Sequence, residues 1–121
     1  MNRRAFESLV TKAIEELPWE FREKLKNVAI IVEDYPSQDL LERMEIDPGE
    51  SLFGLYEGVP LTERGFFAAP LHPDRILIFQ RAIEDECDSV EEVKEELKIT
   101  LVHEVAHFFG MDDDYLEEIG Y

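Results

Sequence analysis

Cysteine is almost missing from this chain, and so are several other features that would assign it to a class. Cys87 is the single cysteine among 121 residues, so no disulfide can form within the chain. A lone thiol is typical of a reducing compartment, and we expect a cytoplasmic protein. The first residues include two arginines but no apolar block of signal-peptide length, and no apolar run approaches the length that crosses a bilayer. We therefore expect neither an internal disulfide nor a membrane span.

Basic residues are scarce as well. Twelve lysines and arginines stand against 29 acidic residues, which gives a formal net charge of −17. Such a charge repels phosphate backbones and anionic lipid surfaces. We expect no nucleic-acid partner and no membrane partner, and we interpret most of the acidic residues as solvated helix faces. Nothing in the sequence indicates the oligomeric state.

The length and the apolar content are ordinary. At 121 residues and 45% hydrophobic content, the chain can build one core but not two, so residues 1–121 are expected to form a single domain. Apolar spacing predicts helices over residues 3–17, 19–25 and about twenty residues from Ser89, and strands over residues 28–32, 52–56 and 75–80. The unbroken apolar run 28–32 is typical of a buried strand. The expected fold is α+β, a short twisted mixed sheet packed against helices, one of them long.

The segments between these elements are less regular. Residues 37–51 allow one or two helical turns before a turn at Asp47-Pro48-Gly49, and a reversal is expected at Gly58-Val59-Pro60. Residues 70–74 are expected to form a rigid loop that carries His72. A loop histidine between prolines is usually structural, so His72 is only a weak candidate for a metal ligand.

The start of the long helix is marked by a capping box. Ser89-Val90-Glu91-Glu92 has the serine and glutamate spacing that satisfies the first N–H groups of a helix. The expected buried stripe of this helix consists of Val90, Val93, Leu97 and Leu101. This helix leads directly into the most informative part of the chain and would hold its side chains on a rigid element.

That part contains His-Glu-x-x-His. His103 and His107 are four residues apart on one helix face, so both rings can reach one metal ion. Glu104 lies about 100° further round the helix, where a carboxylate can reach an activated water molecule rather than the metal. Gly110 then marks the expected end of the helix, because a left-handed residue there favours glycine. Histidines at this spacing can also be ordinary core-edge residues, but the glycine and the acidic run that follow make a metal site the better interpretation.

Zinc suits this set of donors, since it takes imidazole nitrogen and carboxylate oxygen and keeps an open position in catalytic sites. Only fourteen residues follow His107, so a third ligand from a distant second helix is nearly excluded. Asp113 is the preferred third ligand, because it completes His-Glu-x-x-His-x-x-Gly-x-x-Asp. The sequence leaves three nearby competitors open, namely Asp112, Asp114 and Glu117.

The extended motif resembles the active-site helix of the metzincins, with aspartate in the place of their third histidine. The whole chain, through residues 27–34, 52–65, 73–79 and the motif helix, resembles a family of short bacterial metallopeptidase-like proteins, minimal zincins with a matrix-metalloprotease-like domain. One departure is clear: only eight residues follow Asp113, and Met111 comes too early to form the methionine turn of the metzincins. The floor of the metal site must therefore be built differently here.

The resemblance implies a zinc-dependent metallopeptidase with a peptide or protein substrate. Glu104 would be the catalytic general base, and an edge strand would pair with the extended substrate; residues 75–80 are the expected edge strand. Tyr115 and Tyr121 are candidate donors to the oxyanion of the reaction.

Two other functions stay open at this point. A bacterial endoribonuclease family of similar size also uses two helix histidines and a third ligand, but it lacks the glutamate and suits a basic surface. Alternatively, zinc could be structural and hold the acidic C-terminal segment against the helix.

Overall fold

The computed structural model describes residues 1–58 and 74–121. The predicted reversal after Gly58 and the loop that carries His72 lie outside these residues. The described elements follow in the order α1 (Arg3–Glu15), α2 (Trp19–Leu25), β1 (Val28–Glu33), α3 (Gln38–Arg43), β2 (Gly54–Glu57), β3 (Asp74–Phe79), α4 (Gln80–Asp85), α5 (Val90–Phe108) and α6 (Asp113–Glu118). The predicted α+β class is confirmed, with a small mixed sheet and one long helix.

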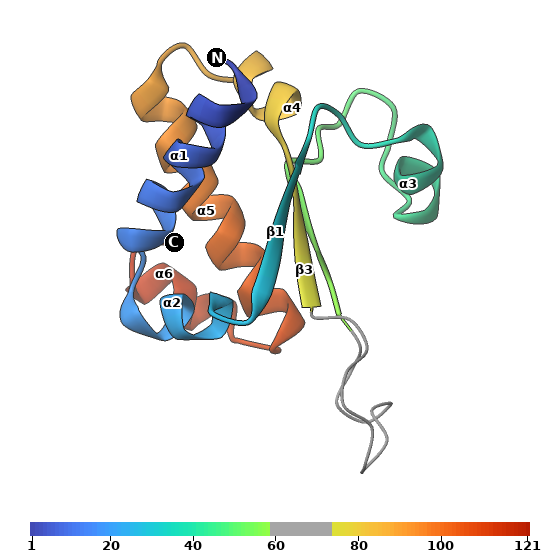
Figure 1. Cartoon of the computed structure of the whole chain (residues 1–121). Helices are drawn as coiled ribbons and strands as arrows, with labels where there is room; N and C mark the ends of the chain where they lie inside the picture. The colour runs from blue at the N-terminus through green and yellow to red at the C-terminus, as the bar shows by residue number, and fades with distance from the viewer. Residues whose placement is uncertain (59–73) are drawn as a thin grey trace.

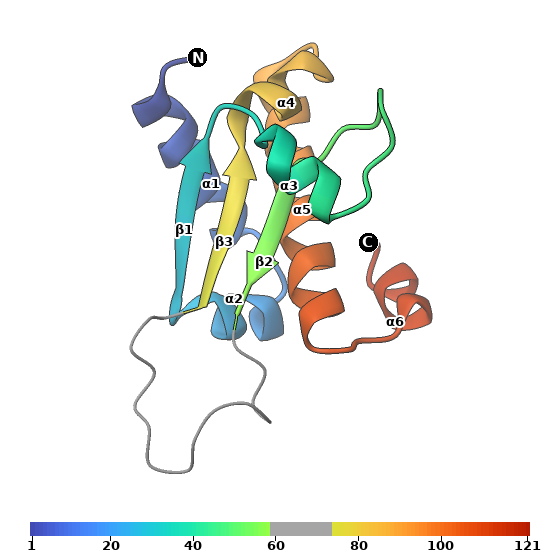
Figure 2. The same ribbon diagram turned by 90° about the vertical axis from the view of Figure 1, so that its right-hand side faces the viewer.

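The three strands have the order β1-β3-β2, as Figure 2 shows face-on. β1 runs parallel to β3, from the pair Val28 and Asp74 onward. β2 runs antiparallel to β3, with Tyr56 opposite Ile76. The prediction that residues 75–80 form the edge strand is therefore wrong, because β3 lies between β1 and β2, which are the edges of the sheet that residues 1–58 and 74–121 form.

Burial explains this arrangement. β3 buries side chains on both faces of the sheet, with Ile76 and Ile78 in the main core and Leu77 and Phe79 in a second cluster. β1 was predicted to be a buried strand, yet each of its residues keeps some exposure. The apolar runs of β1 and β3 look alike in the sequence. The central strand is the one that helices cover on both faces of the sheet, and the sequence does not show which run that is.

The helices form layers around this sheet. Figure 1 shows α1 and α5 stacked on one face of the sheet and α3 on the other. The main core lies between the sheet and α5, where Leu97, Leu101 and Val105 are fully buried. The smaller cluster beneath α3 contains Leu40 and Ala82 besides the two β3 residues. α5 is thus buried on one side for most of its length, which fixes its end beside the sheet.

The caps of α5 agree with the sequence. Ser89 Oγ accepts from Glu92 N at 3.1 Å, and Glu92 Oε2 accepts from Asp88 N at 2.8 Å. At the other end Gly110 has φ +67°, and the N–H of Met111 donates to Ala106 O at 2.8 Å. This is the glycine-dependent helix end predicted for Gly110. Val90 departs from the predicted buried stripe, because it lies in the first turn and is 57% exposed.

Other departures are local. β2 begins at Gly54, two residues later than predicted, and α4 follows β3 directly although no helix was expected there. The turn at Asp47-Pro48-Gly49 is confirmed by a hydrogen bond of 3.0 Å from Glu50 N to Asp47 O. In the described ranges, no helix has the length and apolar content needed to span a membrane.

Candidate active site

The two histidines of the motif belong to the last part of α5. Figure 2 shows this end of the helix beside β2. The ring centroids of His103 and His107 are 5.8 Å apart, and the ring planes make an angle of 76°. His103 is half-buried and His107 is exposed. The pair thus lies where the helix leaves the core, close to each other and accessible from outside.

Glu104 contacts β2 with its carboxylate. Its Oε1 accepts a hydrogen bond of 2.9 Å from the main-chain N–H of Tyr56. Burial raises the pKa of the Glu104 carboxyl, and the Tyr56 N–H, His107 and His103 act in the opposite direction without cancelling it. The side chain is therefore oriented by β2, and it holds a proton more readily than an exposed glutamate does.

Tyr56 belongs to an aromatic group at the end of α5. Its ring stacks on Phe108 with centroids 4.1 Å apart and planes 19° from parallel, and Phe109 meets it edge-on at 6.3 Å. The Tyr56 hydroxyl donates to Asp74 Oδ2 at 2.8 Å. Lys24 of α2 lies over the Phe109 ring, with its Nζ 5.2 Å from the centroid. These contacts join β2, β3 and α2 around the motif, and sequence reasoning did not find them.

The C-terminal segment returns to the motif. The ring Nε2 of His103 lies 2.8 Å from the main-chain oxygen of Tyr121, at hydrogen-bonding distance. Gly120, with φ +91°, turns the chain, and the N–H of Tyr121 donates to Leu116 O at 2.8 Å. Leu116 is buried in the main core and anchors the turn. The sequence signal for this turn is the same as at Gly110, a glycine shortly after apolar helix residues. The contact between Tyr121 and His103 was not predicted from the sequence.

Asp113, the predicted third metal ligand, is not gathered with the two histidines. Asp113 is exposed at the first position of α6. Across residues 1–58 and 74–121, no three histidine, cysteine, aspartate or glutamate side chains gather closely enough to hold one metal ion. Asp112 caps α6, since its Oδ1 accepts from Asp114 N at 2.8 Å. The assignment of Asp113, with Asp112, Asp114 and Glu117 as competitors, stays a prediction.

Tyr115, a candidate oxyanion donor, is engaged elsewhere. Its hydroxyl donates to Glu20 Oε1 of α2, and this hydrogen bond is the main reason that the pKa of Tyr115 is raised. The contact fastens α6 to α2. In this arrangement Tyr115 contributes to the placement of the C-terminal segment.

The donor chemistry at the end of α5 suits zinc. Two imidazoles on one helix face are ligands that zinc prefers, and the adjacent half-buried carboxylate is separate from them. The residues present therefore fit a zinc ion held by His103 and His107, with one or more further ligands to complete the site.

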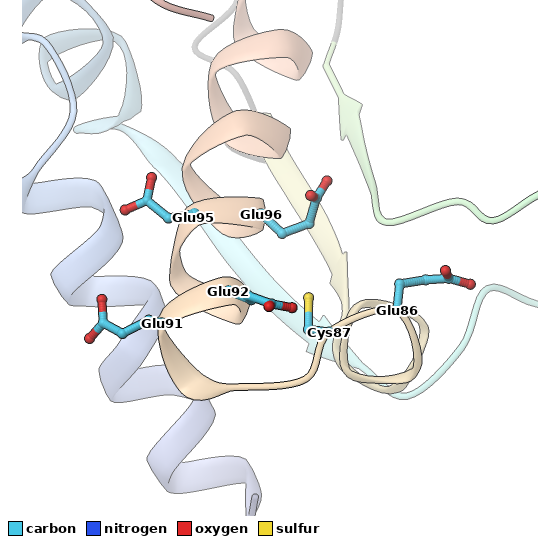
Figure 3. Close-up of a pocket in the computed structure, with 6 residues that line it drawn as sticks. All are labelled: Glu86, Cys87, Glu91, Glu92, Glu95 and Glu96. Atoms are coloured by element: carbon cyan, nitrogen blue, oxygen red, sulfur yellow. The ribbon is translucent and has the colours of Figure 1, made fainter.

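A separate hollow between α4 and the start of α5 has a different character. It measures about 340 Å³ and is lined by Cys87 and five glutamates, as Figure 3 shows. Burial is the first cause that raises the pKa of the Cys87 thiol, and the charges of Glu96 and Glu92 follow. A thiol kept protonated in an acidic surrounding is a poor nucleophile and a poor metal ligand.

Comparisons with known proteins agree with the fold and give a family. Residues 25–121 match the family model of the zincin-like metallopeptidases. Among solved structures, a conserved hypothetical protein from Thermus thermophilus is similar, with a TM-score of 0.61 and 21% sequence identity over 90% of this chain and 94% of that chain. At this identity the likeness concerns the fold. No curated protein matches the chain.

Proposed function

The chain belongs to the zincin-like metallopeptidase family, and from that premise we propose that it hydrolyses peptide bonds, with zinc held by His103 and His107 and with Glu104 as the general base. The proposal is carried by the different contacts that the two histidines and the glutamate of the motif make. The two rings form one pair, whereas the carboxylate is held by the main-chain N–H of Tyr56 on β2.

Zinc, when bound, supplies Lewis-acid polarisation of the scissile carbonyl and of an attacking water molecule. Glu104 accepts the proton of that water and returns a proton to the leaving amine. Its raised pKa suits this exchange, because a base that holds the proton too weakly cannot deliver it to the amine. The hydrogen bond from Tyr56 fixes one carboxylate oxygen and orients the other for proton transfer.

The corrected strand order changes the expected position of the substrate. β2 is an edge strand, and it lies against the helix that carries the motif. An extended peptide can add to such an edge through main-chain hydrogen bonds. We therefore assign the substrate-pairing role to β2 in place of residues 75–80, and the substrate class is an extended peptide or a mobile segment of a protein.

Zinc stoichiometry in the purified protein tests the metal assignment. His103→Ala and His107→Ala should each abolish the binding of one zinc per chain, because a single imidazole cannot hold the ion. Asp113→Ala should weaken binding, whereas Glu118→Ala, an exposed carboxylate on the same short helix, should leave it unchanged. Full zinc occupancy in His107→Ala would contradict the assignment.

Glu104→Gln tests the catalytic part. This variant should keep zinc and lose any peptide hydrolysis that the wild type shows, since an amide cannot accept the proton. A hydroxamate should bind the zinc form one-to-one, because a catalytic zinc keeps a position that an inhibitor can take. Loss of zinc in Glu104→Gln would make Glu104 a ligand and remove its role as a base.

A structural zinc site is the second candidate, because the C-terminal segment returns to α5 and places the main-chain oxygen of Tyr121 2.8 Å from the Nε2 of His103. In that case zinc would fasten the C-terminal segment to α5, and folding would depend on the metal. Absence of hydroxamate binding, together with unfolding on chelation, would support this alternative over the peptidase. The endoribonuclease alternative is disfavoured by Glu104, by the net charge of −17 and by the family match.

A further inference from the structure

β2 lies close against α5 because two positions in this segment have no side chain. A Cβ atom on Gly54 would lie 2.8 Å from Cγ2 of Thr100, and one on Gly58 would lie 2.9 Å from Cζ of Phe108. Cβ atoms do not approach other carbon atoms so closely, so a larger residue at either position must push the strand and the helix apart. Glycine is therefore needed here for space, and neither position has the positive φ found at Gly110.

The residue between these two glycines holds Glu104. Tyr56 donates its main-chain N–H to Glu104 Oε1 at 2.9 Å, and its ring stacks on Phe108. The direction of this N–H follows from the strand pairing. Phe53 O accepts from Phe79 N at 2.9 Å, so in the alternating antiparallel pattern Phe53 faces β3 and Tyr56 faces away from it. The sheet does not use the N–H of Tyr56, which meets the carboxylate instead.

We propose that Gly54 and Thr100 are positioning residues for the reaction, because their contact sets the spacing of β2 and α5 at which the N–H of Tyr56 holds Glu104. The inference rests on the proposed function, in which Glu104 is the general base. Neither residue touches the substrate. They act through Tyr56, and their effect is on the orientation of one carboxylate.

A small change in the spacing of β2 and α5 affects the hydrogen bond to Glu104 more than it affects the apolar packing. Apolar contacts change gradually with distance, and side chains can adjust to a small displacement of the strand. A hydrogen bond to a carboxylate depends steeply on distance and angle, and a general base must stay within hydrogen-bonding reach of its proton. A shift of less than an ångström can therefore preserve the core and still release Glu104.

The experiment uses Gly54→Ala alone and combined with two different changes at Thr100. Thr100→Ser removes Cγ2, the atom that the new Cβ would meet, and keeps the hydroxyl. Thr100→Val keeps a carbon at that position and is the matched control. Recovery with serine will be incomplete, because the new Cβ would also lie 3.1 Å from Leu77 O.

Amide hydrogen exchange at Tyr56, measured by NMR, reports the contact without any need for activity. Gly54→Ala should speed exchange at Tyr56 by roughly 10- to 100-fold, the loss expected for one hydrogen bond to a charged group. Gly54→Ala/Thr100→Ser should recover most of the protection, and Gly54→Ala/Thr100→Val should not. The amides of Leu55 and Glu57, which face β3 in the same pattern, should stay protected in all variants.

Hydrolysis of a fluorogenic peptide mixture gives the functional result. In the Gly54→Ala variant kcat should fall about tenfold or more with KM and zinc content nearly unchanged, and serine at position 100 should restore it. A wild type that hydrolyses no peptide would count against the proposed function, whereas the exchange measurement would still decide whether the contact holds Glu104.

Three outcomes would overturn the inference. They are unchanged exchange at Tyr56 in Gly54→Ala, equal recovery with serine and valine, and faster exchange at Leu55 and Glu57 to the same degree. Glu104→Ala covers the case in which Gly54→Ala does not fold, since it leaves the packing of β2 intact. Tyr56 should then lose its protection, and retained protection would show that Glu104 is not its partner.

Discussion

Burial governs the chemistry of Glu104 at the scale of a single residue. Removal from water raises the pKa of its carboxyl, although the N–H of Tyr56 and the two histidines favour the charged form. The folded chain therefore binds the proton more tightly than the unfolded chain. The resulting stability is fully present below the unfolded pKa, and it is lost as the pH rises through the folded pKa.

Glu104→Gln should consequently gain stability relative to the wild type as the pH rises. The difference between the zinc-free proteins should be smaller near pH 4, because the raised pKa of Glu104 favours its uncharged form as the pH falls. Near pH 7.5 the variant should be the more stable of the two, because glutamine carries no charge to bury. Urea unfolding with a chelator present, at both pH values, measures this, with the exposed Glu118→Gln as the control. A difference that does not vary with pH would contradict the burial argument.

The sequence singled out the motif residues but did not reveal their surroundings. The offset of Glu104 from the histidine face follows from helix geometry alone, and in the structure its carboxylate accepts a hydrogen bond from β2. Its burial and its contact with Tyr56 depend on how β2 packs against α5, about fifty residues apart in the chain. Local patterns carry no information on such a contact. The oxygen of Tyr121 beside His103 was missed for the same reason.

At the scale of elements, the C-terminal turn at Gly120 can be tested with a matched pair of variants. Gly120 has φ +91° and Gly49 has φ +90°, and an added Cβ would have no neighbour within 4 Å at either position. Alanine should therefore introduce similar backbone strain at both, about 1 kcal/mol. Only Gly120 lies next to the residue that contacts His103, so the two variants form a matched pair.

Gly120→Ala should bind zinc more tightly than the wild type, by up to about fivefold, while Gly49→Ala should bind it equally. The reason is competition, because the Nε2 of His103 cannot both bind a metal ion and hydrogen-bond to the oxygen of Tyr121. Calorimetric titration of the metal-free proteins measures the difference. Weaker binding in Gly120→Ala would instead mean that the turn supports the metal site.

The elements themselves were predicted well where the signal was local. The caps of α5, the glycine at its end and the break at Pro18 all depend on neighbours within a few residues. The position of β3 in the centre of the sheet was not predictable, because its apolar run resembles that of β1. α4 was missed because Ala82 and Ile83 are the only apolar residues in a helix that begins without a side-chain cap.

At the scale of the whole molecule, the net charge of −17 is the dominant electrostatic property. Five glutamates line one hollow between α4 and α5. Lys94 pairs with Glu16 and lowers the pKa of its carboxyl. Self-repulsion of this size opposes the compact state and is screened by salt.

Raising sodium chloride from about 10 mM to about 200 mM should therefore raise the melting temperature, by roughly 4 °C for each 1 kcal/mol of repulsion relieved. Calorimetry in sodium and potassium chloride would separate screening from ion-specific effects, since screening is equal for the two. A melting temperature that falls with salt would show that the ion pairs of Lys94 and Lys98 with Glu16 outweigh the repulsion.

The two outer strands have a consequence for how copies of this molecule meet in solution. An open sheet edge is a template on which another chain can pair and aggregate. Here a carboxylate from α5 takes the outward N–H of Tyr56 on β2, and the guanidinium of Arg3 donates to Val32 O on β1. On each outer strand, one charged side chain thus binds a main-chain group that another chain could otherwise use. On β2 that side chain is Glu104 itself, so the residue that serves the chemistry also limits an added strand to the outward main-chain groups other than the N–H of Tyr56.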